Sequence, residues 1–378
     1  MSTTPKNIQI PTVEYRRGIY YLVLDGKTPY ERGYQHGVAL EFPIKKALGQ
    51  FKAWIRQNVG LDDPEEMILD FAENTPYLGS VKADVPDLYD EMQGIAEGAG
   101  VDMKQLFVYQ SFDEFFIFLL TSGALDAGST GHCTTAGVYG RTNKPNFVAH
   151  NNDIPTYHEE LVTVLHIKLP GSDLEMLQST FAGQIGQNGV NNKGVTVGIN
   201  TLANLPSGDG LPVSFNVRKI LEADNLDEAV AYLQQTRFAQ AMNYTIGDRE
   251  KVVCVETWED NAAVLDIYNN GYAVHTNHCL LGEAPKTFEM TSEMGGGSYS
   301  FTMERLALGK ELLADTENVS LESFQQVFKT RPILVYPGKS TGRTLMQMTV
   351  EIPKEGNPVL YLTPDSPNLF CHAQFTFR

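Results

Sequence analysis

The residue of this 378-residue chain best suited to chemistry is Cys133, which has a small, flexible stretch before it and a β-prone run after it. It follows Gly131-His132, and the residues from Cys133 to Tyr139 are typical of a strand. If the bond between His132 and Cys133 were cut, the thiol would become the first side chain of a new chain. The freed α-amino group would lie beside the sulfur and could act as its general base. The simpler alternative is an inert cysteine that packs in a core.

A nucleophilic thiol needs further groups around it, and three later segments carry suitable side chains. Asp153 ends a polar Asn-Asn-Asp run, where a buried carboxylate could orient an α-ammonium group, although the same run also suits a simple turn. Asn277 follows an apolar strand and could donate its amide to an oxyanion. Arg343 precedes a late strand, where it could pair with Asp153 or could be an ordinary surface cation.

The elements that must position these residues change character at Cys133. Before it, the sequence predicts a strand near 18–24 and helices that open at Pro29, Pro64, Pro86 and after Asp102. The helix from Pro29 is expected to continue to residue 54. After Cys133, short β-branched runs between Gly, Asn and Pro turns predict antiparallel strands, interrupted by helices near 213–223, 226–235, 299–313 and 320–328. Grouped rather than alternating elements favour an α+β layered fold.

The composition excludes several classes of protein. With 29 basic and 46 acidic residues, the net charge of −17 disfavours nucleic acid and anionic membranes as partners. The four cysteines are too few and too widely spaced for a disulfide scaffold. The spacing of His275 and His278 matches no common ligand pattern, so no metal is expected. The chain has no phosphate loop and no adenine-binding signature, so no other cofactor is expected either. The polar amino terminus has no segment of signal-peptide type, which predicts a cytoplasmic protein.

Eight short segments, spread over most of the chain, together carry a family resemblance. They are Tyr30–Gly37, Gly94–Val101, Cys133–Thr135, Asn151–Asp153, Gly183–Val190, Asn192–Gly194, Asn243–Thr245 and His275–His278. In this order they resemble the acyl-coenzyme A:6-aminopenicillanate acyltransferase family, cysteine peptidase family C45, of the N-terminal nucleophile hydrolases. The set is not specific for penicillin chemistry.

The resemblance implies a single domain over residues 1–378 with a four-layer αββα sandwich. The chain would be made as a zymogen that cleaves itself before Cys133, so that the helical segment 1–132 and the chain 133–378 stay associated. Cys133 would then be the nucleophile and Asp153 the active-site aspartate. Asn277 would support the oxyanion, and Arg343 would correspond to the arginine before the late strand.

The resemblance also marks residues around the substrate and the cleavage point. The loop 186–192 looks like the family's substrate-side hairpin, so Asn188 or Asn191 is expected to touch the ligand, and Asn151 is a further candidate. The family usually has a small residue before the cysteine, whereas this chain has His132. A glycine would ease the strained geometry of an N-to-S acyl shift. His132 could therefore slow cleavage, or its imidazole could assist proton transfer.

These observations favour an autoprocessing cysteine amidohydrolase or acyltransferase that acts on small N-acyl amides or acyl thioesters, with water or an amine as acceptor. The 132 residues before the cysteine favour the acyltransferase-like branch over the related bile-salt and penicillin V enzymes. A papain-like protease using Cys133, His275 and Asn277 is an alternative, although no aromatic residue follows the cysteine. An unprocessed binding protein, suggested by His132, is another.

Overall fold

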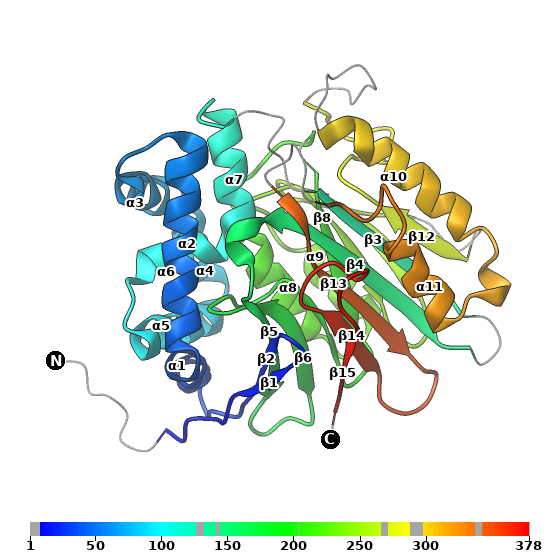
Figure 1. The fold of residues 1–378 in the computed structure, drawn as a ribbon, viewed down its shortest axis with the longest axis horizontal. Helices are drawn as coiled ribbons and strands as arrows, with labels where there is room; N and C mark the ends of the chain where they lie inside the picture. Colours follow the sequence, from blue (N-terminus) through cyan, green and yellow to red (C-terminus); the bar gives the residue numbers. More distant parts are fainter. Residues whose placement is uncertain are drawn as a thin grey trace.

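Two β-sheets lie face to face in the computed structural model, which describes residues 8–125, 132–140, 144–202, 204–265, 271–287, 298–336 and 342–377 (Figure 1). The larger sheet has nine described strands, of which only β2 and β5 pair in parallel. In spatial order they are β1 Glu14–Arg16, β2 Ile19–Leu24, β5 Val162–Lys168, β6 Glu175–Phe181, β7 Asn188–Asn191, β8 Thr196–Thr201, β9 Met242–Gly247, β10 Val252–Trp258 and β11 Asn261–Leu265.

The smaller sheet carries Cys133, and its six described strands are all antiparallel. Their spatial order is β12 Tyr272–His275, β3 His132–Val138, β4 Asn146–Pro155, β13 Gly342–Ile352, β14 Val359–Thr363 and β15 Ala373–Thr376. The late strand predicted after Arg343 is confirmed as β13, which lies next to the strand that carries Asp153.

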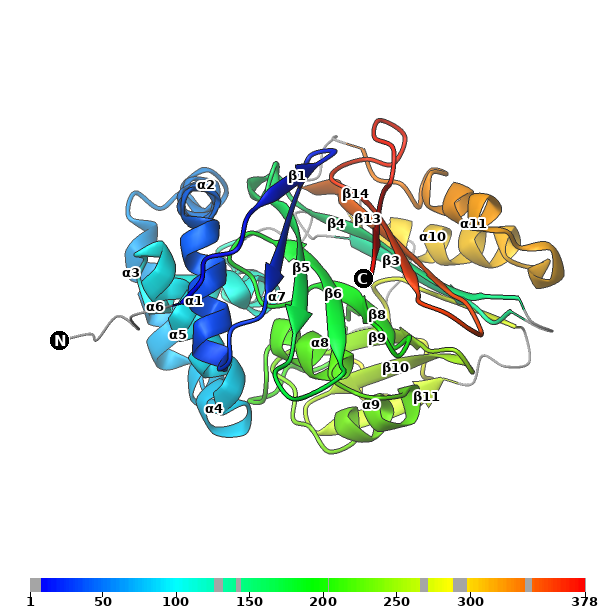
Figure 2. The same cartoon turned by 90° about the horizontal axis from the view of Figure 1, so that it is seen from below.

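Helices cover the outer face of each sheet (Figure 2). Helices α8 Val213–Leu221 and α9 Leu226–Leu233 lie on the larger sheet, and α10 Ser298–Leu312 and α11 Leu321–Phe328 lie on the smaller one. One core of buried apolar side chains runs from the first third of the chain into the space between the sheets, and another lies under α10 and α11. This arrangement confirms the predicted α+β class and the αββα sandwich.

Seven helices in the described part of the first third of the chain pack beside one end of the sandwich (Figure 1). They are α1 Pro29–Ala39, α2 Glu41–Val59, α3 Pro64–Asn74, α4 Tyr77–Asp84, α5 Pro86–Ala99, α6 Met103–Gln110 and α7 Phe112–Thr121. Among all the residues that the structure describes, no helix is both long and apolar enough to cross a membrane.

The predicted continuous helix from Pro29 to residue 54 is wrong, because the chain breaks at Leu40 between α1 and α2. Pro43 explains the break. A proline has no N–H to donate, and its ring collides with the carbonyl of the residue four positions before it in a continuous helix. The helix start at Pro29 is confirmed, and there Thr28 and Glu31 form a reciprocal capping box.

Two glycine pairs explain why the segments 30–37 and 94–101 carry their patterns. Gly33 and Gly37 on α1 face Gly94 and Gly98 on α5, and the two backbones nearly touch. A Cβ on Gly33 would lie 1.9 Å from a backbone oxygen of α5, and one on Gly94 would lie 2.2 Å from a backbone oxygen of α1. These motifs therefore serve helix packing rather than chemistry.

Gly94→Ala should consequently destabilise the fold by about 1–3 kcal/mol, because a methyl group has no room against a backbone oxygen. Gly49→Ala is the matched control: Gly49 is also helical, but a Cβ there meets nothing within 4 Å. The control should be neutral or gain up to about 1 kcal/mol from helix propensity. Denaturant unfolding measures both, and equal stabilities of the two variants would contradict the close packing of α1 on α5.

Candidate active site

Strand β3 places Cys133 at the boundary between the two sheets. Side chains alternate along a strand, and Thr135 points toward the larger sheet, where its hydroxyl lies 2.7 Å from Asn200 Oδ1. Cys133 shares that face and is half-buried. Thr134 points the other way, toward α10, and accepts a hydrogen bond from Arg305. The thiol of Cys133 thus lies on the inner face of the smaller sheet. Its backbone carbonyl is contacted from the outer face by Arg305 of α10.

Asn277 contacts Cys133 through the backbone. Strand β12 pairs with β3, with His275 opposite Thr135, so the loop after β12 arrives at the start of β3. The backbone N–H of Cys133 donates to Asn277 Oδ1 at 2.9 Å, and Asn277 Nδ2 donates to the Thr201 carbonyl at 3.1 Å. The expected proximity of Asn277 to Cys133 is therefore present, and its oxyanion role remains a prediction.

Arg305 on α10 is the cation of this site, and sequence analysis missed it. The side chain is fully buried and donates to the Cys133 carbonyl, to Thr134 Oγ1 and to Asn277 Oδ1, the last two at 2.9 Å. It lies within an ordinary predicted helix with no motif around it, so only the packing of α10 on β3 and β12 brings it to the site.

Asp153 lies on β4 opposite His132 in the strand register. Its Oδ1 accepts a hydrogen bond from Thr344 Oγ1, and its buried Oδ2 has no partner among the described residues. Burial raises the pKa of this carboxyl to about 8, while the Arg305 charge and the Thr344 bond act in the opposite direction. Asp153 is therefore largely protonated at neutral pH in the uncut chain.

The predicted pairing of Arg343 with Asp153 is wrong. Arg343 instead binds Glu159, with Nη2–Oε1 at 3.0 Å, and Asp365. Strand alternation explains the error, since Thr344 is the residue opposite Asp153 on β13 and shares its face. The adjacent Arg343 must point to the other side.

Several of these groups change the pKa of the Cys133 thiol. Burial is the main cause that raises its pKa, and the charges of Asp153 and Asp113 raise it further. The Asp153 backbone bond and the Arg305 charge lower the same pKa, but by less. The thiol is consequently protonated in this structure, and a base would have to remove its proton before the sulfur could act as a nucleophile.

Asp113, on α7, is a second acidic group that sequence analysis missed. Thr201 Oγ1 donates to its Oδ1 at 3.1 Å, and Thr201 is also the residue whose carbonyl accepts from Asn277. Burial raises the pKa of Asp113 to about 6. The helical first third of the chain therefore contributes a side chain to the surroundings of Cys133.

The three asparagines expected to touch the substrate have structural partners. Residues 188–191 form the buried strand β7 rather than an open hairpin loop. Asn188 is buried between the sheets and its Nδ2 lies 3.0 Å from His150 Nδ1. Asn191 bonds with both ends of its amide, to the Leu221 carbonyl and to backbone N–H groups of its own turn. Asn151 donates to the Phe328 carbonyl on α11 at 3.0 Å. These bonds account for Asn188 and Asn191 without a ligand, whereas the buried Oδ1 of Asn151 has no partner among the described residues.

Some predictions fall on residues outside the described part of the chain. These are the flexible stretch before the cysteine, residues 128–131, and most of the segment before Arg343, residues 339–341. For His132 only the backbone is described, and it pairs with Asp153. Within the described ranges, no group of three or more His, Cys, Asp or Glu side chains could hold a metal ion.

The raised pKa of Asp153 predicts a pH-dependent stability. The ordinary pKa is 3.8 and the folded value about 8, so the folded chain binds more protons than the unfolded chain between these values. The contribution of Asp153 is therefore present below pH 3.8 and is lost as the pH rises through about 8. Asp153→Asn, in a Cys133→Ala background, should remove this loss while keeping an acceptor for Thr344.

Urea unfolding of the parent and the Asp153→Asn variant at pH 5 and at pH 8 provides the measurement. The variant should gain stability relative to its parent at the higher pH. Other buried acids, such as Asp113 and Glu114, remain in both proteins and cancel in the comparison. Parallel pH profiles would show that Asp153 is already ionised in the fold.

Comparison with known proteins identifies the family. Residues 141–365 match the family described as acyl-coenzyme A:6-aminopenicillanic acid acyl-transferase. The chain is 29% identical over 352 residues to the 40 kDa form of acyl-coenzyme A:6-aminopenicillanic-acid-acyltransferase of Emericella nidulans, covering 88% of this chain and 92% of that protein. The match to the family begins after Cys133, so the role of this cysteine remains a proposal.

Two solved structures show weaker similarity. An N-acylethanolamine-hydrolyzing acid amidase ortholog of Caenorhabditis elegans is 17% identical, with a TM-score of 0.42 over 65% of this chain and 100% of that chain. A mutant conjugated bile acid hydrolase of Clostridium perfringens is 13% identical, with a TM-score of 0.41 over 65% of this chain and 96% of that chain. By its match over more than half of its length, the chain belongs to the acyl-coenzyme A:6-aminopenicillanic acid acyl-transferase family.

Proposed function

We propose that the protein is an autoprocessing cysteine amidohydrolase or acyltransferase that acts on small N-acyl amides or acyl thioesters through an acyl-enzyme on Cys133. One observation carries the proposal: the backbone nitrogen of Cys133 donates to Asn277 Oδ1 at 2.9 Å. The nitrogen that cleavage would convert into an α-amino group is thus already held by Asn277. Membership of an acyltransferase family supports the reaction class.

Cleavage begins when the Cys133 sulfur attacks the carbonyl carbon of His132. The thiol proton passes to the Cys133 nitrogen as the C–N bond breaks, which leaves a thioester between His132 and the sulfur. Water then hydrolyses the thioester, giving a carboxylate on His132, a free thiol and a free α-amino group on Cys133. Arg305, at the Cys133 carbonyl and at Asn277 Oδ1, fixes the segment on which this shift occurs.

Turnover uses the new amino group as the base. The α-amino group takes the thiol proton, which a buried thiol with a raised pKa would not release by itself. The sulfur attacks the acyl carbon of the substrate, and the ammonium group returns the proton to the leaving amine or thiolate. Asn277 Nδ2 has two hydrogens and uses one on Thr201, so the other is available to the oxyanion. Water or an amine then takes the acyl group.

The histidines near the site argue against the papain-like alternative. His275 Nε2 lies 2.7 Å from Glu256 Oε1, and its Nδ1 lies 2.9 Å from the Thr276 carbonyl. His278 Nδ1 lies 3.0 Å from the Thr302 hydroxyl. Both histidines are occupied by polar partners other than the Cys133 thiol, so an imidazole base is the weaker candidate.

Buried contacts across the proposed cleavage point would hold the two pieces together. Glu91 on α5 and Arg218 on α8 form a bidentate ion pair with both N–O distances at 3.0 Å, and both side chains are buried. Gln110 accepts from the Ile185 N–H at 2.7 Å, and Glu114 accepts from the Val213 N–H at 2.8 Å. These bonds do not depend on the His132–Cys133 linkage.

The first experiment is an intact-mass measurement. Wild-type protein should separate under denaturing conditions into residues 1–132 and 133–378, and should elute as one species under native conditions. Cys133→Ala should remain a single 41.9 kDa chain. Cys371→Ala is the matched control, because Cys371 is free and exposed, and it should cleave normally. A fully active wild-type protein that stays uncut would refute the proposed origin of the base.

The two arginines give a second prediction. Arg305→Met removes a buried cation that donates to Cys133 and Asn277, and should slow cleavage or turnover by about 100-fold, because a displacement of about 1 Å at the reacting groups can cost that much. Arg343→Met removes a partly exposed ion pair with Glu159 and Asp365 and should change either rate by less than about threefold. Cleavage time courses followed by electrophoresis distinguish them, and the reverse order of effects would restore Arg343 to the site.

A further inference from the structure

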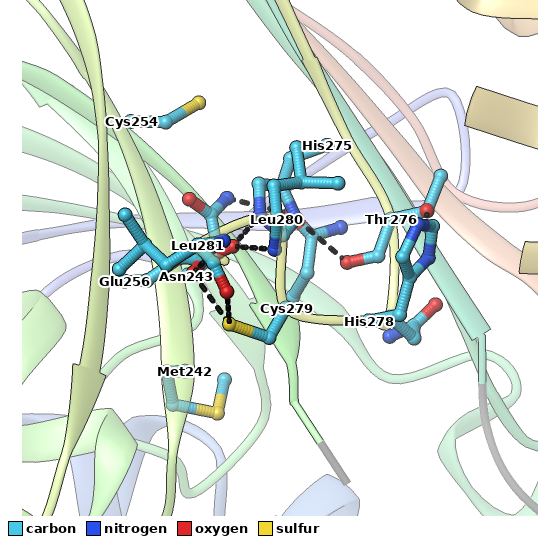
Figure 3. Close-up of polar contacts among 12 residues, drawn as sticks. Met242, Asn243, Cys254, Glu256, His275, Thr276, His278, Cys279, Leu280 and Leu281 are labelled. Carbon is cyan, nitrogen blue, oxygen red and sulfur yellow. Dashed lines mark hydrogen bonds and ion pairs between the residues drawn. The ribbon is translucent and has the colours of Figure 1, made fainter. Parts of the chain in front are cut away.

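A buried carboxylate on the larger sheet accepts several hydrogen bonds from His275 and from the loop that carries Asn277. Glu256 lies on β10, is fully buried, and receives hydrogen bonds from His275 Nε2 at 2.7 Å and from Cys279 Sγ at 2.9 Å. The backbone N–H groups of Leu280 and Leu281 donate to the same carboxylate at 2.6 and 3.2 Å. Figure 3 shows these donors converging on Glu256. Of these donors, His275 precedes Asn277 in the chain and the others follow it.

The carboxylate is built to stay ionised in this environment. Burial alone would raise the pKa of Glu256. The hydrogen bond and electrostatic attraction of His275, together with the bonds from Cys279 and Leu280, outweigh burial and hold the pKa below its ordinary value. A charged acceptor makes each of these hydrogen bonds stronger than a neutral one. The loop is therefore held by several hydrogen bonds to one ionised carboxylate.

The opposite side of the loop is fixed as well. The backbone N–H of Asn277 donates to Thr302 Oγ1 on α10 at 2.8 Å, and the N–H of Cys279 donates to Asn204 Oδ1 at 3.2 Å. Glu256 belongs to the larger sheet, whereas the loop continues from β12 of the smaller sheet. The carboxylate thus connects the two sheets at the point where Asn277 meets Cys133.

The carboxamide of Asn277 tolerates little displacement. It must reach the Cys133 N–H, Arg305 and the Thr201 carbonyl together, all within 3.1 Å. A shift of about 1 Å would break such contacts and can cost about 100-fold in rate.

We propose that Glu256 is a positioning residue, which holds residues 276–281 so that the Asn277 carboxamide is aligned on Cys133. The inference rests on the proposed function of Asn277. It adds that Glu256 influences the reaction indirectly, by positioning Asn277. Cys279, which donates to Glu256, then helps to hold this loop and is not a second nucleophile.

The test is a double-mutant cycle between Glu256 and Asn277. Glu256→Gln keeps the shape of the side chain and should lower the kcat of the matured enzyme by about 10–100-fold with little change in KM. The same change in an Asn277→Ala background should cost less than about twofold, because there is no carboxamide left to align. Short N-acyl amides serve as the probe substrates, and thermal unfolding is recorded for every variant.

Glu91→Gln is the matched control, since Glu91 is an equally buried carboxylate whose ion-pair partner is Arg218 on α8 rather than a residue of this loop. It should lower the unfolding temperature while its effect on kcat, if any, is the same in both Asn277 backgrounds. If the losses from Glu256→Gln and Asn277→Ala multiply, Glu256 acts elsewhere and the inference is overturned. Full turnover in Asn277→Ala would overturn the proposed function itself.

A second pair of variants covers the case in which Glu256→Gln fails to fold. Cys279→Ala removes one donor to Glu256 but leaves the carboxylate in place, whereas Cys279→Ser keeps a donor. Turnover should fall several-fold in the alanine variant and recover in the serine variant, with Cys133 alkylated by iodoacetamide in both. Wild-type turnover in both variants would show that the bond between Cys279 and Glu256 has no influence on the site.

Discussion

The hydrogen bond between the Cys133 backbone nitrogen and Asn277 Oδ1 is the interaction on which the site depends. A backbone N–H withdrawn from water needs an acceptor, and here the acceptor comes from a loop 144 residues later in the sequence. The pairing of β12 with β3 delivers that loop, α10 supplies Arg305 to the same oxygen, and Glu256 sets the loop's path. The sandwich therefore has to form before the site exists, so the proposed cleavage would have to follow folding.

The first third of the chain is more than a segment to be discarded. Its helices bury Glu91 against Arg218, and α7 brings Asp113 to Thr201, the residue that also binds Asn277. A helical segment that only blocked the site would need no such contacts. Its retention after cleavage, as proposed, would keep the carboxylate of Asp113 beside the mature nucleophile.

The sequence predicted the strands well, because β-branched runs and turn residues are local signals, whereas the four-layer αββα arrangement was implied by the family resemblance. The sequence also predicted that Cys133 and Asn277 belong to one site, and the structure does place them in contact, although their catalytic roles stay predictions. The predicted family is confirmed. Prediction failed where position depends on strand phase or on tertiary packing. On β13 the residue opposite Asp153 is Thr344, so the neighbouring Arg343 points to the other face of the sheet. Arg305 had no local pattern that distinguished it from a solvated helix residue, although it is buried.

The balance of charge around Cys133 gives cleavage an electrostatic consequence. In the uncut chain Asp153 is buried with a raised pKa and is largely neutral, so Arg305 lacks a fully ionised counterpart there. The proposed cleavage would create an α-ammonium group at Cys133, and a nearby positive charge lowers the pKa of a carboxyl. Asp153 would then ionise and hold the ammonium group that had charged it. The same step that makes the base would thereby make the group that orients it, and a protonated aspartate on a buried strand is consistent with this proposed sequence of events.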